Sequence, residues 1–216
     1  ERHAEAMLER VGGDLPQAAQ LANGRGNLFL AQQDFEKASE YYKEVLRLRE
    51  EMGNAAPSSL GGTYGNLGTA ALELGDNETG KEYFDKALTL FQEAYGPRHP
   101  STAKGYNNLG IALERMGEYA AAIEHQTKAL EIKRELLGDK HPSVAGSLGN
   151  LANVHSRMGD HEGASRLYRQ AFDIFSESLG ADHPYVGRCH DGIGKAELAL
   201  EHWDEAQAQL ERAVDI

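Results

Sequence analysis

The sequence predicts an all-α protein, a solenoid of about five stacked helical hairpins. Turn glycines recur at steps of 43, 42 and 42 residues, each followed four residues later by a proline; they are Gly53, Gly96, Gly138 and Gly180. Small residues recur at a step of 42 from Ala38 to Ala206. Between these markers, apolar residues follow the three- and four-residue spacing of a helix. A lone hairpin cannot bury its apolar stripe, so the hairpins are expected to stack.

Composition indicates a folded chain and argues against several classes of partner. The 216 residues are 40% apolar and carry a formal charge of −12. Binding of nucleic acid needs a basic face, so we expect none. No apolar run approaches the ~20 residues that span a bilayer, so no membrane partner is expected. Cys189 is the single cysteine, which excludes an intrachain disulfide and favours a cytoplasmic location.

The elements are expected in this order along the chain. Residues 1–14 form a short N-terminal helix or a partial repeat. One continuous solenoid domain then follows over 15–216, with repeats at approximately 15–55, 56–98, 99–140, 141–182 and 183–216. The first repeat departs from the others because Arg25 stands where they have Leu or Ile. The second has Gly80 where Ala is usual, and Ala56 where a histidine precedes the proline of later repeats.

Residues 99–140 show the pattern of one repeat. Pro100 suits the first turn of a helix, where its missing N–H costs nothing. One face of that helix is marked by Tyr106, Leu109, Gly110 and Leu113. Gly117 ends it, and the buried stripe of a second helix follows at Tyr119, Ala122, Ile123, Leu130 and Ile132. Gly138 ends the second helix as a left-handed C-cap. Two helices of ~18 residues each are therefore expected.

A His-Pro phrase opens the third, fourth and fifth repeats. Because a phrase repeated at fixed spacing indicates architecture, His99, His141 and His183 are expected to cap or hydrogen-bond the next helix. Repeats stack ~10 Å apart, whereas zinc binds its ligands at ~2.0–2.1 Å, so no metal site is expected from them. Two polar residues, His155 and Glu197, occupy positions that are apolar in other repeats.

The residues of the third repeat resemble the signature of the tetratricopeptide repeat (TPR) family; they are Leu109, Gly110, Leu113, Gly117, Tyr119, Ala122 and Ala129. The 42-residue period, with "LGDKHPSVAGSLGNLANV", is similar to the longer variety found in kinesin light chains and in bacterial TPR proteins, some of them fused to kinases or ATPases. The resemblance covers about 15–216. It implies a right-handed superhelix whose first helices line a concave groove.

The resemblance also implies which residues line that groove. They are Asn27, Asn66, Lys104, Asn107, Asn108, Ile111, Arg115, Asn150, Asn153, Arg157, Arg188 and Lys195. Asn66, Asn108 and Asn150 form a ladder at 42-residue steps. An amide side chain both donates and accepts, so this ladder can pair with the backbone of an extended peptide. The five cations of the set favour a peptide with carboxylates.

No catalytic motif accompanies this surface. The sequence lacks a glycine-rich phosphate loop, a G-x-S-x-G elbow and an H-E-x-x-H pair. We therefore expect no enzyme activity and no cofactor, but a scaffold that binds an extended peptide segment of a partner protein, with acidic segments favoured. Two alternatives keep the fold. The chain is the regulatory or sensor arm of a larger enzyme, such as a bacterial Ser/Thr kinase or NTPase, or a structural module that self-associates through the ends of the array.

Overall fold

The structure is a computed structural model that describes residues 14–216. Every regular element in that range is an α-helix and none is a strand, so the all-α prediction is confirmed. The helix expected within residues 1–14 falls almost entirely outside the described range.

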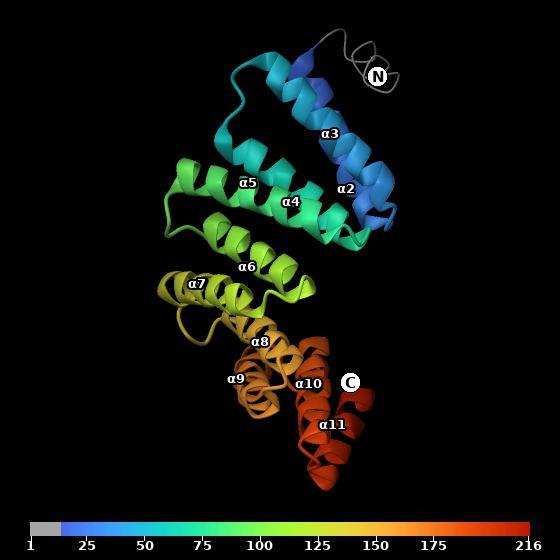
Figure 1. Cartoon of the computed structure of the whole chain (residues 1–216), viewed down its shortest axis with the longest axis vertical. Coiled ribbons are helices and arrows are strands. Elements are labelled where there is room, and N and C mark those ends of the chain that lie inside the picture. Colours follow the sequence, from blue (N-terminus) through green and yellow to red (C-terminus); the bar gives the residue numbers. More distant parts are fainter. Residues whose placement is uncertain (1–13) are drawn as a thin grey trace. The chain divides into compact units, whose positions relative to one another are not determined.

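The described chain divides into two compact units, the first ending at Met116 and the second beginning at Gly117 (Figure 1). The first unit contains α2 (Leu15–Ala31), α3 (Phe35–Met52), α4 (Pro57–Glu73), α5 (Asn77–Tyr95) and α6 (Pro100–Arg115). The second contains α7 (Tyr119–Leu137), α8 (Pro142–Arg157), α9 (His161–Leu179), α10 (Pro184–Ala199) and α11 (Trp203–Asp215). We call the even-numbered helices first helices and the odd-numbered ones second helices. Within each unit, every helix packs against its neighbour in the chain.

Side chains cap the starts of most helices. Among second helices, Asp34, Asp76 and Asp160 accept the backbone N–H three residues later. Before α6, α8 and α10 the cap is a histidine, and its ring Nδ1 accepts the backbone N–H two residues later at 3.0–3.1 Å. The prediction that these histidines cap the next helix is therefore confirmed.

The turn inside each hairpin needs a residue with positive φ. Gly75, Gly117 and Gly159 supply it, with φ between 79° and 83°. Glycine suits this position because it lacks the Cβ that penalises left-handed backbone. At the equivalent positions of the first and last hairpins, the chain has Gln33 and Glu201, both with φ of 61°. These two turns are therefore strained in a way that the glycine turns are not.

Other glycines let the two helices of a hairpin pack closely. A Cβ added to Gly68 of α4 would lie 2.6 Å from a ring carbon of Phe84 on α5. A Cβ added to Gly26 of α2 would lie 2.7 Å from a ring carbon of Tyr42 on α3. Both aromatic rings are buried. Part of the high glycine content thus makes room for aromatic rings between paired helices.

Packing between hairpins is polar in some places and apolar in others. Arg49 of α3 donates to the hydroxyl of Thr63 on α4, and Lys133 of α7 donates to the hydroxyl of Ser147 on α8 at 2.7 Å. Burial lowers the pKa of both the Arg49 guanidinium and the Lys133 amine. Phe175, 42 residues after Lys133, fills the corresponding position of α9 and packs in an apolar cluster. The helical repeat therefore tolerates different chemistry at the same place.

Candidate functional site

The first helices of the first unit contact one another directly. The Asn66 amide on α4 donates to Oδ1 of Asn27 on α2 at 3.5 Å, a long hydrogen bond. Arg115 on α6 donates to Oε1 of Glu73 on α4 at 2.8 Å and to the carbonyl of Leu72 at 2.7 Å. Polar contacts therefore join α2 to α4 and α4 to α6 at two separate places on α4, and we call the face of these three helices that carries them the first-helix surface. Asn27, Asn66 and Arg115 were all predicted to line a groove.

Asn27 is exposed at one end of the first-helix surface, and a buried tyrosine on α3 fixes its side-chain oxygen. Its Oδ1 accepts the hydroxyl of Tyr42 at 2.8 Å, and the Tyr42 side chain is fully buried. Burial raises the pKa of Tyr42 to about 12, so the hydroxyl remains a donor at neutral pH. The same arrangement recurs three repeats later, where Asn153 accepts the hydroxyl of Tyr168 at 2.5 Å. The tyrosine hydroxyl thus fixes the side-chain oxygen of each asparagine. The amide N–H groups of the asparagines take no part in this hydrogen bond.

The predicted residues of α6 share one helix face. Lys104, Asn108, Ile111 and Arg115 follow one another at steps of three and four, which places them along one side of a helix. Lys104 and Arg115 are exposed, whereas Asn107, Asn108 and Ile111 are half-buried. The α6 face therefore combines exposed cations with partly covered amides and one apolar side chain.

In the second unit, α8 and α10 carry the remaining five predicted residues and contact each other. Asn150 and Asn153 are half-buried, and Arg157, Arg188 and Lys195 are exposed. The Arg188 guanidinium lies 6.0 Å from the ring centre of Tyr185, within reach of a weak cation–π contact. The twelve predicted residues thus fall into seven on the first unit and five on the second.

The positive charge of this set is partly neutralised. Arg115 pairs with Glu73, and Lys195 pairs with Asp191 one turn earlier on α10 at 2.7 Å. Within residues 14–216, Lys104 and Arg188 form no ion pair, so they are the cations best able to meet a carboxylate. The sequence analysis named five cations in the groove but did not predict which carboxylates they pair with. Glu73 lies 42 residues before Arg115, and this spacing is the sequence signal that could have identified the pair.

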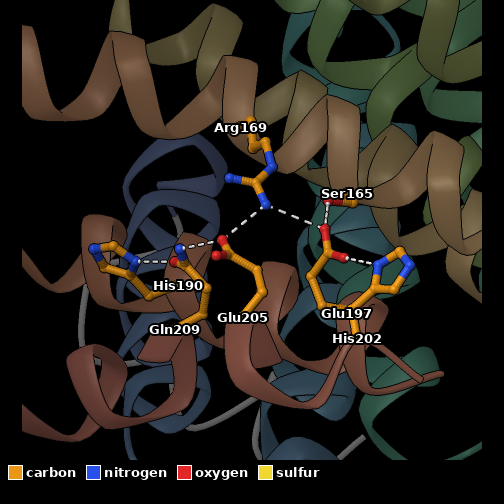
Figure 2. A network of polar contacts seen from close by, with 7 residues as sticks. All are labelled: Ser165, Arg169, His190, Glu197, His202, Glu205 and Gln209. Carbon is orange, nitrogen blue, oxygen red and sulfur yellow. Dashed lines mark hydrogen bonds and ion pairs between the residues drawn. The ribbon is translucent and has the colours of Figure 1, made fainter. Parts of the chain in front are cut away.

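A second polar cluster joins α9, α10 and α11 (Figure 2). The sequence analysis named Glu197 but did not predict the cluster around it. Glu197 of α10 is 7% exposed. It accepts the Ser165 hydroxyl at 2.6 Å, the Arg169 guanidinium at 3.1 Å and the ring of His202 at 2.8 Å. Burial alone would raise the pKa of Glu197, but these three hydrogen bonds outweigh it and the pKa lies below its ordinary value.

The cluster continues outward along α11. Figure 2 shows Arg169 pointing between Glu197 and Glu205, and its guanidinium is 3.0 Å from Oε1 of Glu205. Glu205 also accepts from Gln209, whose own Oε1 lies 2.6 Å from Nδ1 of His190. Each polar group of the cluster is therefore engaged by another. The cluster connects three helices and leaves no arrangement that resembles a nucleophile with its base.

Histidine–carboxylate pairs close the hairpin turns of the last two repeats, in opposite orders. His155 at the end of α8 is 2.7 Å from Asp160, the N-cap of α9. Forty-two residues later, Glu197 stands in place of His155, and His202 stands in place of Asp160. The backbone N–H of Gly163 and the His155 ring lower the pKa of Asp160. The contact is thus kept while its two residues are exchanged.

Other chemistry finds little support in the described part of the chain. Burial raises the pKa of Cys189 to about 11, so its thiol is protonated and is a poor nucleophile at neutral pH. No group of three or more His, Cys, Asp or Glu side chains in residues 14–216 is arranged to hold a metal ion. None of the helices between Leu15 and Asp215 combines the length and apolarity needed to cross a membrane.

Solved structures with the same fold were found in several proteins. The chain is 22% identical to BtubC (BKLC) from P. vanneervenii, with a TM-score of 0.81 over 99% of this chain and 86% of that one. It is 20% identical to nearly identical TPR-like repeats of a putative kinesin light chain from Podosopora anserina, with a TM-score of 0.77 over 91% of this chain and 92% of that one. It is 16% identical to a Rap protein complexed with competence and sporulation factor, with a TM-score of 0.77 over 91% of this chain and 53% of that one. These likenesses confirm the predicted helical-repeat solenoid.

The sequence itself matches models of the tetratricopeptide repeat along its length. One model matches residues 59–135, 101–177 and 143–216, and another matches residues 1–55. The comparison with curated proteins gave no match. Together, the family models cover nearly all of the sequence, and the prediction of a tetratricopeptide repeat protein is confirmed. The chain belongs to the tetratricopeptide repeat family.

Proposed function

We propose that this TPR chain is a protein-interaction scaffold whose first helices bind an extended peptide segment of a partner protein. The observation that carries the proposal is the contact of Asn27 with Asn66, which aligns amide side chains of successive first helices. The Tyr42 hydroxyl fixes the oxygen of Asn27, so the first amide of the series is held in place before a ligand arrives. Preorganised polar groups lose less entropy on binding than mobile ones.

The mode of recognition follows from the two kinds of side chain on the surface. Amides such as Asn66 and Asn108 donate and accept, so they suit peptide backbone of any sequence. Lys104 is an exposed cation without a carboxylate partner in the described residues, so it suits a carboxylate of the ligand. We therefore propose that backbone contacts supply general affinity and that Lys104 favours acidic segments.

Such a scaffold needs no catalytic group of its own. The Rap protein, which resembles this chain in fold, was solved complexed with competence and sporulation factor, and this supports a binding role. The proposal for the present chain rests on its own polar surface, because likeness at 16% identity indicates the fold alone.

The test begins with peptides captured from a partner protein by the 216-residue chain and then titrated by calorimetry. Lys104→Glu should weaken binding of an acidic peptide about tenfold or more, because a charge-assisted hydrogen bond contributes ~1.5–3 kcal/mol and each 1.4 kcal/mol is tenfold. Asn66→Ala should weaken acidic and neutral peptides alike. The matched control is Lys43→Glu, the same charge reversal on the second helix α3, where Lys43 is also exposed.

The proposal fails if the peptide binds Lys104→Glu and Asn66→Ala as tightly as it binds the unmodified chain. Equal weakening by Lys104→Glu and Lys43→Glu would mean that net charge, rather than the first-helix surface, attracts the ligand.

A further inference from the structure

The histidines that precede α6, α8 and α10 make one hydrogen bond that fixes their protonation state. Nδ1 of His99, His141 and His183 accepts the backbone N–H of the residue two positions later, at 3.1, 3.0 and 3.1 Å. A backbone N–H can only donate, so Nδ1 must carry a lone pair and the ring proton must lie on Nε2. A second proton would have to bind Nδ1, where it would replace the acceptor by a donor. A ring that is protonated at both nitrogens therefore cannot accept the hydrogen bond that caps the helix.

Each of these three rings lies at the N-terminus of a helix. The N-terminus of a helix carries a partial positive charge. The first turns of α6, α8 and α10 contain no acidic side chain that would offset it. His155 and His202 form ion pairs with carboxylates, and neither is one of the three caps.

Several titratable and charged groups lie near the three caps. Tyr95 stacks on His99 with 4.0 Å between the ring centroids, and Arg98 precedes His99 in the chain. Asp139 and Lys140, which precede His141, pair with Arg134 and Glu177. The Tyr185 ring is 5.0 Å from the His183 ring and lies under the Arg188 guanidinium, and Asp182 precedes His183. The Asp139 carboxylate is already engaged by the Arg134 guanidinium.

The two histidines inside the hairpin turns stand in the opposite situation. His155 lies in the last turn of α8, where a cation interacts favourably with the helix dipole, and its ring contacts Asp160. His202 contacts Glu197, and α11 has two acidic residues in its first turn. The carboxylates of Asp160 and Glu197 are ionised at neutral pH, so a proton on either ring would turn a hydrogen bond to an anion into an ion pair.

We infer that acidification loosens the turns that lead into α6, α8 and α10, while the turns that lead into α9 and α11 stay closed. Imidazoles in general change charge between about pH 5 and pH 8, and this range is the one to test. The affected helices carry ten of the twelve residues predicted to line the groove; those outside them are Asn27 and Asn66. The repeat thus contains a pH-sensitive element at its connections between hairpins, independent of which ligand the surface binds.

Hydrogen exchange of the 216-residue chain, measured by mass spectrometry at about pH 8 and about pH 5.5, tests this inference. Rates are corrected for the intrinsic pH dependence of exchange. Segments that begin α6, α8 and α10 should lose about five- to tenfold in protection at the lower pH, as expected from the loss of an N-cap. Segments around the His155 and His202 turns should keep or gain protection.

The control variant is the triple substitution His99→Asn, His141→Asn and His183→Asn. Asparagine is a favoured N-cap that does not titrate, so this variant should show no selective loss of protection at the lower pH. Equal protection at both pH values in the unmodified chain would overturn the inference, and so would an equal loss in the triple variant. If the triple variant does not fold, nitrogen NMR of the unmodified chain replaces it. Near pH 8 the rings of the three capping histidines should carry their proton on Nε2. A proton on Nδ1 would contradict the proposal.

Discussion

The guanidinium of Arg115 on α6 forms an ion pair with the carboxylate of Glu73 on α4, with 2.8 Å between Nη2 and Oε1. The second nitrogen of the guanidinium donates to the carbonyl of Leu72 at the end of α4. Arg115 and Glu73 are 42 residues apart, so they occupy the same place in successive repeats. One residue predicted to meet a ligand therefore also joins two first helices.

We predict that Arg115→Ala lowers the free energy of unfolding by about 1–2 kcal/mol, because it removes an exposed ion pair and a charged hydrogen bond to a helix end. Lys104→Ala on the same helix removes no such contact and should change stability by less than about 0.5 kcal/mol. Urea denaturation of both variants checks this. Equal stability of the two variants would mean that the Arg115 contacts contribute nothing.

The strained turns allow a prediction of increased stability. Gln33→Gly and Glu201→Gly should each stabilise the chain by about 1 kcal/mol, since a non-glycine residue in left-handed backbone costs roughly 1–2 kcal/mol and glycine gives part of this back through its freer unfolded state. Gly75→Ala, at the equivalent position of the second hairpin, should have the opposite effect. Thermal and chemical denaturation measure these changes, and a loss of stability in both glycine variants would contradict the assigned backbone conformation.

Two glycines of α4 should respond oppositely to the same substitution. Gly68→Ala places a methyl group 2.6 Å from the Phe84 ring and should destabilise by about 1–3 kcal/mol through overpacking. Gly65→Ala meets nothing within 4 Å and should stabilise the helix by up to about 1 kcal/mol. Denaturant midpoints distinguish the two. If Gly68→Ala proves as stable as Gly65→Ala, the two helices do not pack as described.

The buried carboxylate of Glu197 should give the stability a specific dependence on pH. Because the pKa of Glu197 is lower in the folded chain than its ordinary value of 4.5, the ionised group stabilises the fold above about pH 4.5, and this contribution is lost as the pH falls below that value. Glu197→Gln should therefore be less stable at pH 7 by about 2–3 kcal/mol and should lose less stability than the unmodified chain on further acidification.

The control for Glu197→Gln is Glu211→Gln on the exposed face of α11, which should leave the acid profile unchanged. Denaturation curves between about pH 7 and about pH 3 provide the comparison. Parallel profiles for the Glu197→Gln variant and the unmodified chain would show that another carboxylate dominates the acid response.

Much of the fold was predictable because a few residues determine where helices begin and end. Pro100 was expected to open a helix and Gly138 to end one, and the structure starts α6 at Pro100 and ends α7 at Leu137. Helices of ~18 residues were expected, and the structure has 16 in α6 and 19 in α7. Proline and glycine act through local backbone geometry, which a sequence displays directly.

Side-chain partners were less predictable because they depend on tertiary packing. Nothing in the sequence around Asn27 shows that Tyr42 holds its oxygen, since the two meet only when α2 and α3 pair. Glu197 was recognised as a polar residue at an apolar position, but its partners Ser165 and Arg169 come from the preceding helix. A contact between equivalent positions of successive repeats, such as Arg115 with Glu73, does leave a trace in the sequence, because its residues are 42 apart.

The exchanged pairs His155–Asp160 and Glu197–His202 have a consequence for anyone who aligns or redesigns these repeats. Compared position by position, each substitution exchanges an imidazole for a carboxylate, or the reverse, and looks severe. Taken as a covarying pair, the two exchanges together preserve a single interaction. A consensus repeat built by averaging each alignment column separately would discard both partners, and grafting one partner alone, as in His155→Glu, would set two carboxylates against each other.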